Sequence, residues 1–450
     1  MNEIKNFLEQ EKKIKKIILK SINKIKNIID EAFIRIIKTY NTGIVVRNGK
    51  TEYIEFHDDA EFFISVYSNY KQGTSLSKDL SSDSIKKTIF SAINISKYTS
   101  KDKCSGLPEF DLLKYKIKDL NLFHPINLKL KDSIKLAYLT EKFALNYNSK
   151  IINSEGGYFN SSNSIVSFGN TKGIFGSYKF SNHSLSTCVL AKNSNSKKIE
   201  RDYYYSNSRK LSTLKSPKII GINCAKRVLL KLNSRKIITQ KCPVILISDV
   251  AYSIFNSFSK SINGNLVYKK STFLLNDLNK LIFPKWMNIF ENPHIKKGIG
   301  SCPFDDEGTL TAPRFIIKNG FLKTWLLNSY TSKKLGLNNT GHSGGIYNWI
   351  FLNKNNNFSF KKLLKFMNTG LVITDLMGDG VNMINGNYSR GASGYFIKNN
   401  FFKYSVSEIT ISGNLKNIFK NIVLMSNDYN LNQNIQCGSI LISEMNISGK

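Results

Sequence analysis

The sequence is poor in the residues that usually build metal sites and disulfide frameworks. Its 450 residues include 6 cysteines and 5 histidines. No two cysteines form a C-x-x-C pair, so zinc-ribbon spacing is absent, and their wide scatter excludes a disulfide framework. No uncharged apolar run approaches the roughly 18 residues that a membrane span needs, and the charged N-terminal residues lack the apolar core of a secretory signal. We therefore expect a cytoplasmic protein with reduced cysteines and no membrane partner.

Acidic residues are scarce beside basic ones, with 32 Asp and Glu against 65 Lys and Arg, a net charge of +33. Such an excess suggests a nucleic-acid partner at first. However, only 8 of these cations are arginines, and bidentate reading of bases and phosphates favours Arg over Lys. The lysines are spread over the whole chain, as in proteins from genomes that drift towards A+T. Charge alone therefore does not predict specific nucleic-acid binding.

The length and hydrophobic content predict several packed domains, since 450 residues with 41% hydrophobic side chains exceed what one core usually serves. Periodicity predicts a mixture of amphipathic helices and antiparallel strands, which makes the fold class α+β. An irregular polar stretch at residues 98–125 indicates the first boundary. We predict an N-terminal α+β domain (1–100), a central α+β domain (101–235) and a C-terminal β-rich, Gly-rich domain (236–450).

Local patterns predict individual elements within these segments. Isoleucines at steps of three and four predict a helix in the first thirty residues, and Asn48-Gly49 predicts a type I′ hairpin turn. Alternation predicts a third strand at residues 61–67 and several short strands between 151 and 205. Further helices are expected at 84–97, 133–146 and 218–232 and from Asp249, a strand at 243–248, and hairpins around Asn319-Gly320 and Asn399-Asn400.

Glycine is dense in the last third, where it marks bends or close backbone approach. Gly341-His342-Ser343-Gly344-Gly345 satisfies the G-x-S-x-G pattern of a nucleophile elbow, in which the serine needs a later histidine as its base. No histidine follows His342, so we interpret the segment as a glycine-rich loop.

Metal and phosphate motifs are absent from the chain. The closest histidines, His294 and His342, cannot share a helix, so no helical zinc pair exists. Distant residues such as His342, Cys437 and Asp305 could still assemble a site, but a cysteine such as Cys437 is more often a buried, small apolar side chain. Asp305-Asp306-Glu307-Gly308 could ligate a cation, but a solvated acidic turn before glycine is the simpler interpretation. Neither a Walker A loop nor a G-x-G-x-x-G loop occurs.

One set of segments is shared with a known family: residues 271–275, 306–308, 340–349, 370–380, 387–394, 406–415 and 434–438. In these segments the chain resembles the TldD/PmbA metalloprotease family, and within it the PmbA (TldE) type of chain. The resemblance covers nearly the whole chain. It implies a cytoplasmic two-subunit peptidase that acts on unstructured peptides. In such an enzyme a TldD-type subunit carries zinc on His-Glu-x-x-x-His and a further cysteine.

The resemblance places Ser248, Asp249 and Ser253 of this chain at the His-Glu-x-x-x-His positions, and Cys437 at about the place of the cysteine ligand. It therefore implies that this chain is the metal-free partner, with no cofactor of its own, while zinc belongs to the TldD-type subunit. We name no catalytic residue. The candidate cleft residues are Gly341, His342, Gly344, Gly345 and Cys437. The alternative function is a basic nucleic-acid-binding or regulatory protein without a peptidase role.

Overall fold

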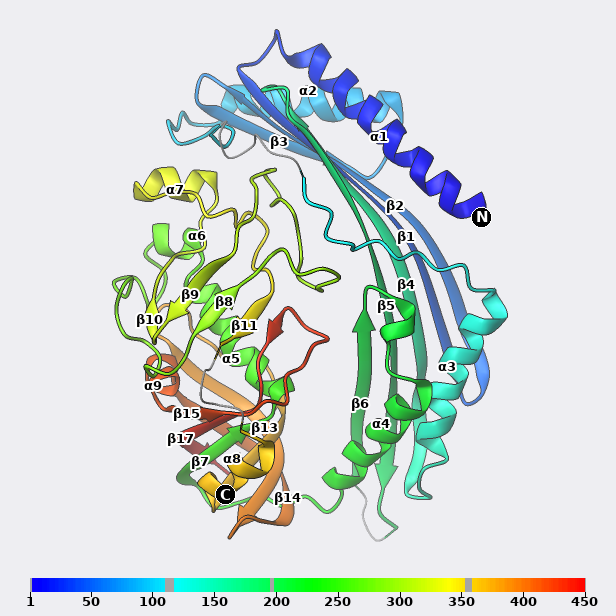
Figure 1. The fold of residues 1–450 in the computed structure, drawn as a ribbon, viewed down its shortest axis with the longest axis vertical. Coiled ribbons are helices and arrows are strands. Elements are labelled where there is room, and N and C mark those ends of the chain that lie inside the picture. The colour runs from blue at the N-terminus through cyan, green and yellow to red at the C-terminus, as the bar shows by residue number, and fades with distance from the viewer. Residues whose placement is uncertain (1, 110–116, 195–197, 353–357, 450) are drawn as a thin grey trace.

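The computed structural model describes residues 2–109, 117–194, 198–352 and 358–449. A lobe built on one long, twisted sheet lies beside a second lobe formed by the C-terminal half of the chain (Figure 1). Helices and antiparallel strands occur in both lobes, which confirms the predicted α+β class.

The long sheet has six strands in the order β3-β2-β1-β4-β5-β6. Its strands are β1 (Glu31–Arg47), β2 (Lys50–Ser68), β3 (Lys71–Ser77), β4 (Ile151–Asn170), β5 (Phe175–Lys192) and β6 (Ile199–Ser208). The central pairing of β1 with β4 is antiparallel and places Thr42 opposite Ser161. Because β1–β3 and β4–β6 form one sheet, the predicted boundary near residue 100 separates two halves of the same sheet.

The turn between β1 and β2 is the predicted Asn48-Gly49 turn, with φ of 49° and 76°. Two other local predictions were wrong. Residues 61–67 continue β2 instead of forming a third strand, and residues 151–205 form three long strands instead of several short ones. The glycines and serines of β4 stay inside the strand because β1 and β5 supply backbone hydrogen bonds on both sides.

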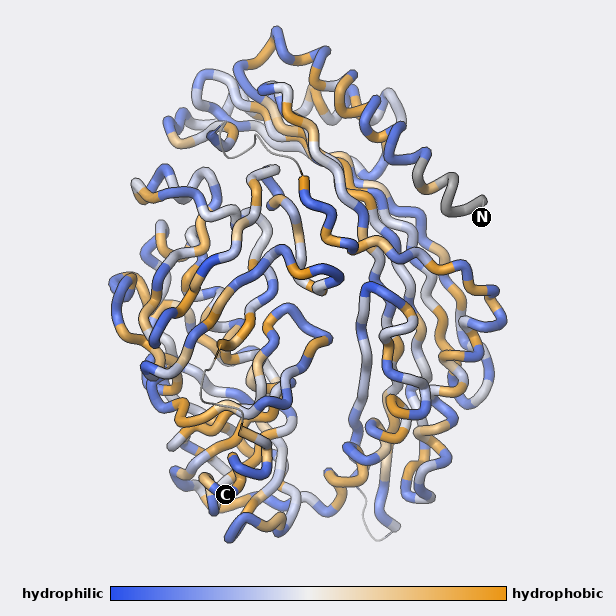
Figure 2. The backbone as a smooth tube through the Cα atoms, viewed as in Figure 1, coloured by the Kyte–Doolittle hydropathy of each residue, from blue (hydrophilic) through white to orange (hydrophobic). Residues whose placement is uncertain are grey.

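Four helices cover one face of the long sheet. They are α1 (Asn2–Ile25), α2 (Ser82–Tyr98), α3 (Leu130–Leu145) and α4 (Pro217–Lys231). In α1, hydrophobic and hydrophilic residues alternate (Figure 2), and Ile14, Ile18 and Ile22 pack against β1 and β4, as the spacing predicts. α3 and α4 cover the other end of this face, around Phe159 and Leu185.

The opposite face of the long sheet contacts the C-terminal lobe. Phe33 and Phe168 pack with Phe304 there, and Arg35 of β1 pairs with Asp306 at 2.8 Å. Farther along, the buried Arg209 donates to the backbone carbonyls of Gly298 and Ile299. Aromatic packing and arginine contacts therefore join the two lobes.

The C-terminal lobe contains two further sheets around one large hydrophobic core. One has the order β14-β13-β12-β7-β17-β15 and the other β10-β9-β8-β11-β16. The strands of the first are β7 (Gln240–Leu246), β12 (Gly370–Met377), β13 (Asn387–Lys398), β14 (Phe401–Asn414), β15 (Ile422–Met425) and β17 (Ile440–Ser448). Those of the second are β8 (Ile289–Glu291), β9 (Arg314–Lys318), β10 (Phe321–Leu322), β11 (Trp349–Phe351) and β16 (Ile435–Gln436).

Short helices pack on these two sheets, and both predicted hairpins are present, β9–β10 and β13–β14. The helices are α5 (Ser248–Ser261), α6 (Gly264–Tyr268), α7 (Ser329–Leu335), α8 (Phe360–Met367) and α9 (Leu415–Lys420). The helix predicted from Asp249 is α5, which begins directly after the central strand β7.

The contact of α3 with β4 depends on Gly157. A Cβ atom at this position would lie 2.1 Å from the backbone oxygen of Ala137, whereas a Cβ atom at Gly43 of β1 would have no neighbour nearer than 3.9 Å. We expect Gly157→Ala to lower the free energy of unfolding by about 1–3 kcal/mol, the usual cost of overpacking. Gly43→Ala is the matched control and should change it little. Equal melting curves for the two variants would contradict this account of the contact.

Candidate functional site

The three residues at the implied metal-ligand positions lie in the first two turns of α5. Asp249 accepts hydrogen bonds from Arg227 of α4, at 3.0 Å, and from the side-chain amide of Asn430, at 2.5 Å. The Ser253 hydroxyl donates to the backbone carbonyl of Val250, as serines inside helices often do. Both carboxylate oxygens of Asp249 and the hydroxyl of Ser253 therefore have partners within the protein.

Cys437 lies at the same place, just after the short strand β16. Its thiol contacts the carbonyl oxygen of Ser248 at 3.7 Å, and the side chain is buried. Burial raises the pKa of the Cys437 thiol far above its ordinary value, so the thiol stays protonated at neutral pH. The structure thus brings Cys437 together with Ser248 and Asp249.

These donors do not fit a zinc site. Zinc binds imidazole nitrogen, thiolate sulfur or carboxylate oxygen, usually in a set of three or four. Here Ser248 and Ser253 offer only hydroxyl groups, and the thiol of Cys437 is protonated. The carboxylate of Asp249 already forms an ion pair with an arginine. Among the residues that the structure describes, no three His, Cys, Asp or Glu side chains are grouped so that they could hold a metal ion.

Arg227 connects α5 to the long sheet. Its guanidinium lies 3.0 Å from Asp249 of α5 and 3.5 Å from the buried Asp202 of β6. Burial by itself would lower the pKa of Arg227, but the two aspartates raise it overall, so Arg227 remains charged. Lys231, one helical turn farther along α4, pairs with Asp202 and with Asp375 of β12. This ion cluster holds β6 beside the N-terminus of α5.

A pocket of about 540 Å³ opens between β6 and the start of α5. It is lined by residues 204–208 of β6, Thr213, Lys215, Ser248, Asp249 and residues 428–432. In Figure 1 the loop before β16 extends from the C-terminal lobe towards β6 across this region. Asn432 of this loop accepts a hydrogen bond from the backbone N–H of Asn207, and Gln433 donates to the hydroxyl of Tyr205.

The other predicted cleft residues lie elsewhere. Gly341, His342, Gly344 and Gly345 belong to an irregular loop between α7 and β11, and within the described chain they are not among the residues that line this pocket. The loop has no strand–turn–helix geometry around Ser343, so it is not a nucleophile elbow. It packs instead on the acidic turn, where Asp305 accepts from the backbone N–H groups of Ser343 and Thr309.

The segment 305–308 is a turn, as expected, with Gly308 at φ 77°. The prediction that it is solvated was wrong for its first residue, because Asp305 is buried. Burial and the nearby Glu307 raise the pKa of Asp305 well above its ordinary value. The acidic turn therefore belongs to the contact between the lobes, next to the Arg35–Asp306 ion pair.

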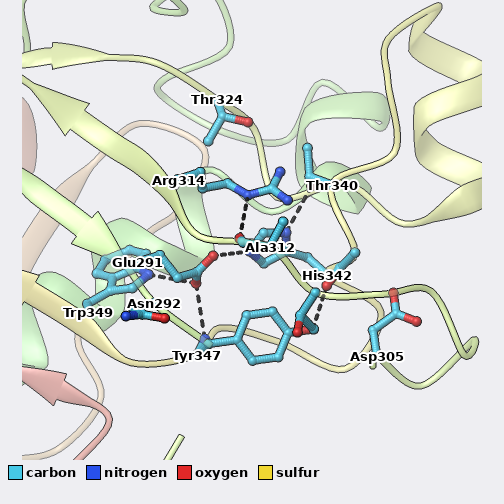
Figure 3. A network of polar contacts seen from close by, with 12 residues as sticks. Glu291, Asn292, Asp305, Ala312, Arg314, Thr324, Thr340, His342, Tyr347 and Trp349 are labelled. Atoms are coloured by element: carbon cyan, nitrogen blue, oxygen red, sulfur yellow. Dashed lines mark hydrogen bonds and ion pairs between the residues drawn. The ribbon is translucent and has the colours of Figure 1, made fainter. Parts of the chain in front are cut away.

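His342 forms a buried pair with Glu291 of β8 (Figure 3). The imidazole nitrogen Nε2 lies 2.7 Å from Glu291, which also accepts from the Trp349 indole and from the backbone N–H of Tyr347. Burial alone would raise the pKa of Glu291, but His342 and these donors lower it overall. Sequence patterns gave no indication of Glu291, which lies 51 positions from His342.

The sequence patterns also did not predict Arg227 and Asn430, which donate hydrogen bonds to Asp249. The sequence does carry one signal for Arg227, because arginine is rare in this lysine-rich chain. Arg35, Arg209 and Arg227 all join elements of the two lobes. A rigid guanidinium makes several directed hydrogen bonds at once, which lysine cannot reproduce.

The fold and the site define a two-lobed α+β protein in which Ser248, Asp249 and Cys437 lie together at the start of α5 without the donor set of a zinc site. Three family models match it: PmbA/TldA metallopeptidase domain 1 at residues 32–96, the central domain at 123–232 and the C-terminal domain at 239–449. The chain belongs to the PmbA/TldA metallopeptidase family.

Known proteins resemble the chain over almost its whole length. A metalloprotease PmbA homolog of Buchnera aphidicola subsp. Acyrthosiphon pisum (strain APS) is 45% identical over 100% of this chain and 97% of the relative. The metalloprotease PmbA of Escherichia coli O157:H7 is 45% identical over 94% of this chain and 93% of its own. The structure of TldE from Thermococcus kodakarensis has the same fold, with a TM-score of 0.81, 18% identity and coverage of 96% and 100%. In the described residues no helix is long and apolar enough to cross a membrane.

The buried Glu291–His342 pair should matter for stability. We expect His342→Ala to lower the free energy of unfolding by about 3–5 kcal/mol, because it leaves a buried carboxylate without its partner. His57→Ala is the matched control: His57 pairs with Glu55 on an exposed strand, and such pairs contribute about 0–1 kcal/mol. Urea titration of both variants measures the difference, and similar midpoints would contradict the assigned role of His342.

Proposed function

We propose that this chain is the metal-free subunit of a cytoplasmic metallopeptidase that cleaves unstructured peptides together with a TldD-type, zinc-binding subunit. The observation that supports this most is the residue set at the start of α5. Ser248, Asp249 and Cys437 lie together, Ser253 follows in the next turn, and the donor atoms of these residues do not fit zinc. Asp249 is neutralised by the guanidinium of Arg227 instead of by a metal ion.

The free edge of β6 suits the binding of an extended peptide. β6 is the last strand of the long sheet, so one row of its backbone groups has no neighbouring strand. In an antiparallel pair, alternate residues direct both N–H and C=O away from the partner strand. The N–H of Asn207 donates to Asn432 across the pocket, so Asn207, Tyr205 and Tyr203 are the outward-directed residues. A peptide strand could therefore pair with β6 beside Tyr205.

Two polar side-chain atoms beside this edge lack a hydrogen bond. The side-chain oxygen of Asn207 is buried, and neither it nor the amide oxygen of the nearby Gln433 has a hydrogen-bond partner within the described structure. Asn207 lines the pocket. Buried acceptors without donors are costly, and the N–H groups of a bound peptide are the donors that this edge would receive.

The division of chemistry between the two subunits follows from these residues. When bound in the partner, zinc would polarise the peptide carbonyl and activate water. Asn207, Tyr205 and the loop 428–432 of this chain would hold the peptide in one register. Such positioning alone changes reaction rates by orders of magnitude, although it involves no proton transfer from this chain.

The first test measures metal and activity separately. We expect the purified chain, dialysed without chelator, to hold far less than one zinc per chain and to leave an unfolded peptide uncleaved. Addition of a TldD-type subunit should give cleavage that a chelator abolishes. One zinc per isolated chain, or chelator-resistant cleavage by this chain alone, would contradict the proposal.

The second test concerns the edge of β6. In the reconstituted enzyme, Asn207→Ala should raise KM for an unfolded peptide by about tenfold, the loss of roughly one hydrogen bond, and leave kcat nearly unchanged. Asn193→Ala is the matched control, because Asn193 pairs with Asn233 and does not line the pocket. An unchanged KM for Asn207→Ala, or a loss of kcat alone, would show that the peptide does not bind at this edge.

A further inference from the structure

A second pocket, independent of the proposed peptidase role, lies on the helix-covered face of the long sheet. Its volume is about 570 Å³, within the range of small-molecule sites. α1 covers one end of this face and α3 the other, and the pocket lies between Phe7 of α1 and Ser133 of α3. Its floor is formed by strands β1 and β4.

Aromatic and apolar side chains form most of the walls of the pocket, beside the polar Asn41, Thr42 and His57. Phe7 stacks on Phe123 with ring centroids 5.2 Å apart and meets Tyr40 edge-on. Phe56 and Phe159 also line the pocket. Asp58, at the same pocket, forms an ion pair with Lys38. Such walls favour a flat, uncharged ring over a charged ligand.

The floor is polar, and its hydrogen-bonding directions are fixed. Ser161 and Asn163 of β4 line the pocket, and as alternate residues of one strand they share a face about 6.6 Å apart. The backbone of His124 orients both side chains. Its C=O acts on Ser161 through His183, and its N–H acts on Asn163 through Ser181.

Ser161 is oriented through His183. The buried His183 places Nε2 3.0 Å from the carbonyl oxygen of His124, which can only accept, so Nε2 carries the hydrogen. In the neutral ring Nδ1 must then accept, and it does so from the Ser161 hydroxyl at 2.9 Å. Burial lowers the pKa of His183, which keeps the ring neutral at neutral pH. The lone pairs of the Ser161 oxygen thus remain as acceptors.

Asn163 is oriented through Ser181. The N–H of His124 donates to the Ser181 hydroxyl at 2.9 Å, and that hydroxyl donates to the side-chain oxygen of Asn163 at 2.7 Å. The amide NH₂ of Asn163 is thereby left as a donor. The floor therefore presents one acceptor and one donor whose roles are set in advance, which lowers the cost of ordering them when a ligand binds.

We propose that this pocket binds a small, neutral, planar heteroaromatic ring that carries a hydrogen-bond donor for Ser161 and an acceptor for Asn163. Nucleobases and aromatic carboxamides share this chemistry. The ring would lie among Phe7, Tyr40, Phe56, Phe123 and Phe159, where stacking supplies affinity, while the floor selects the arrangement of donor and acceptor.

The test is a titration of the full-length chain, followed by ligand-observed NMR, with uracil and nicotinamide as probes. 1,3-Dimethyluracil is the control ligand, because it keeps the ring and both carbonyls but has no donor. We expect at least one probe to bind with Kd of about 1 mM or below, and the dimethylated ring to bind at least about tenfold more weakly, as the loss of a hydrogen bond predicts. The two probes distinguish a nucleobase-type from a carboxamide-type ligand.

Variants of the floor complete the test. Ser161→Ala and Asn163→Asp should each weaken binding about tenfold or more, since one removes the acceptor and the other replaces the donor. Ser162→Ala is the matched control: its hydroxyl bonds to the carbonyl of Asn182, and alternation places it on the opposite face. Circular dichroism checks that each variant is folded. If neither probe bound at about 10 mM, if dimethyluracil bound as tightly as uracil, or if the floor variants bound like Ser162→Ala, the proposal would be wrong.

Discussion

The pocket between β6 and α5 depends on one interaction, the placement of Arg227 between Asp202 and Asp249. Asp202 belongs to the edge strand of the long sheet, and Asp249 to the first turn of α5 in the other lobe. Ion pairs of this partly buried kind contribute little net stability, because desolvation offsets most of the attraction. Their effect here is geometric, since they fix the distance between β6 and α5 and so the width of the pocket.

At the start of α5 a guanidinium compensates the carboxylate of Asp249. A carboxylate at this position requires a nearby cation, since an uncompensated partly buried charge is costly. Arg227 supplies that cation, and Asn430 binds the remaining oxygen. Ser253 satisfies its hydroxyl within the helix and burial keeps the Cys437 thiol protonated beside the carbonyl oxygen of Ser248, so these groups have partners within the protein. Under the proposed function, the peptidase chemistry comes from another subunit.

The two faces of the long sheet serve different purposes. One face is closed by the C-terminal lobe, where Phe33, Phe168 and Phe304 pack and Arg35 meets the acidic turn. The other face is covered by helices at both ends, and the aromatic-walled pocket lies on the strands between them. There the strands present aromatic side chains beside Ser161 and Asn163, whose hydrogen bonds within the protein are fixed.

The sequence by itself determined the elements whose conformation depends on near neighbours. Isoleucine spacing identifies α1, and Asn48-Gly49 identifies the turn between β1 and β2. Helix faces and positive φ angles are decided within a few residues. Only the tertiary structure decided the lengths of β2 and β4, the joining of two predicted domains in one sheet, and the partners Arg227, Asn430 and Glu291. These depend on pairing and burial between distant segments, such as Thr42 with Ser161, and no local preference encodes which segments meet.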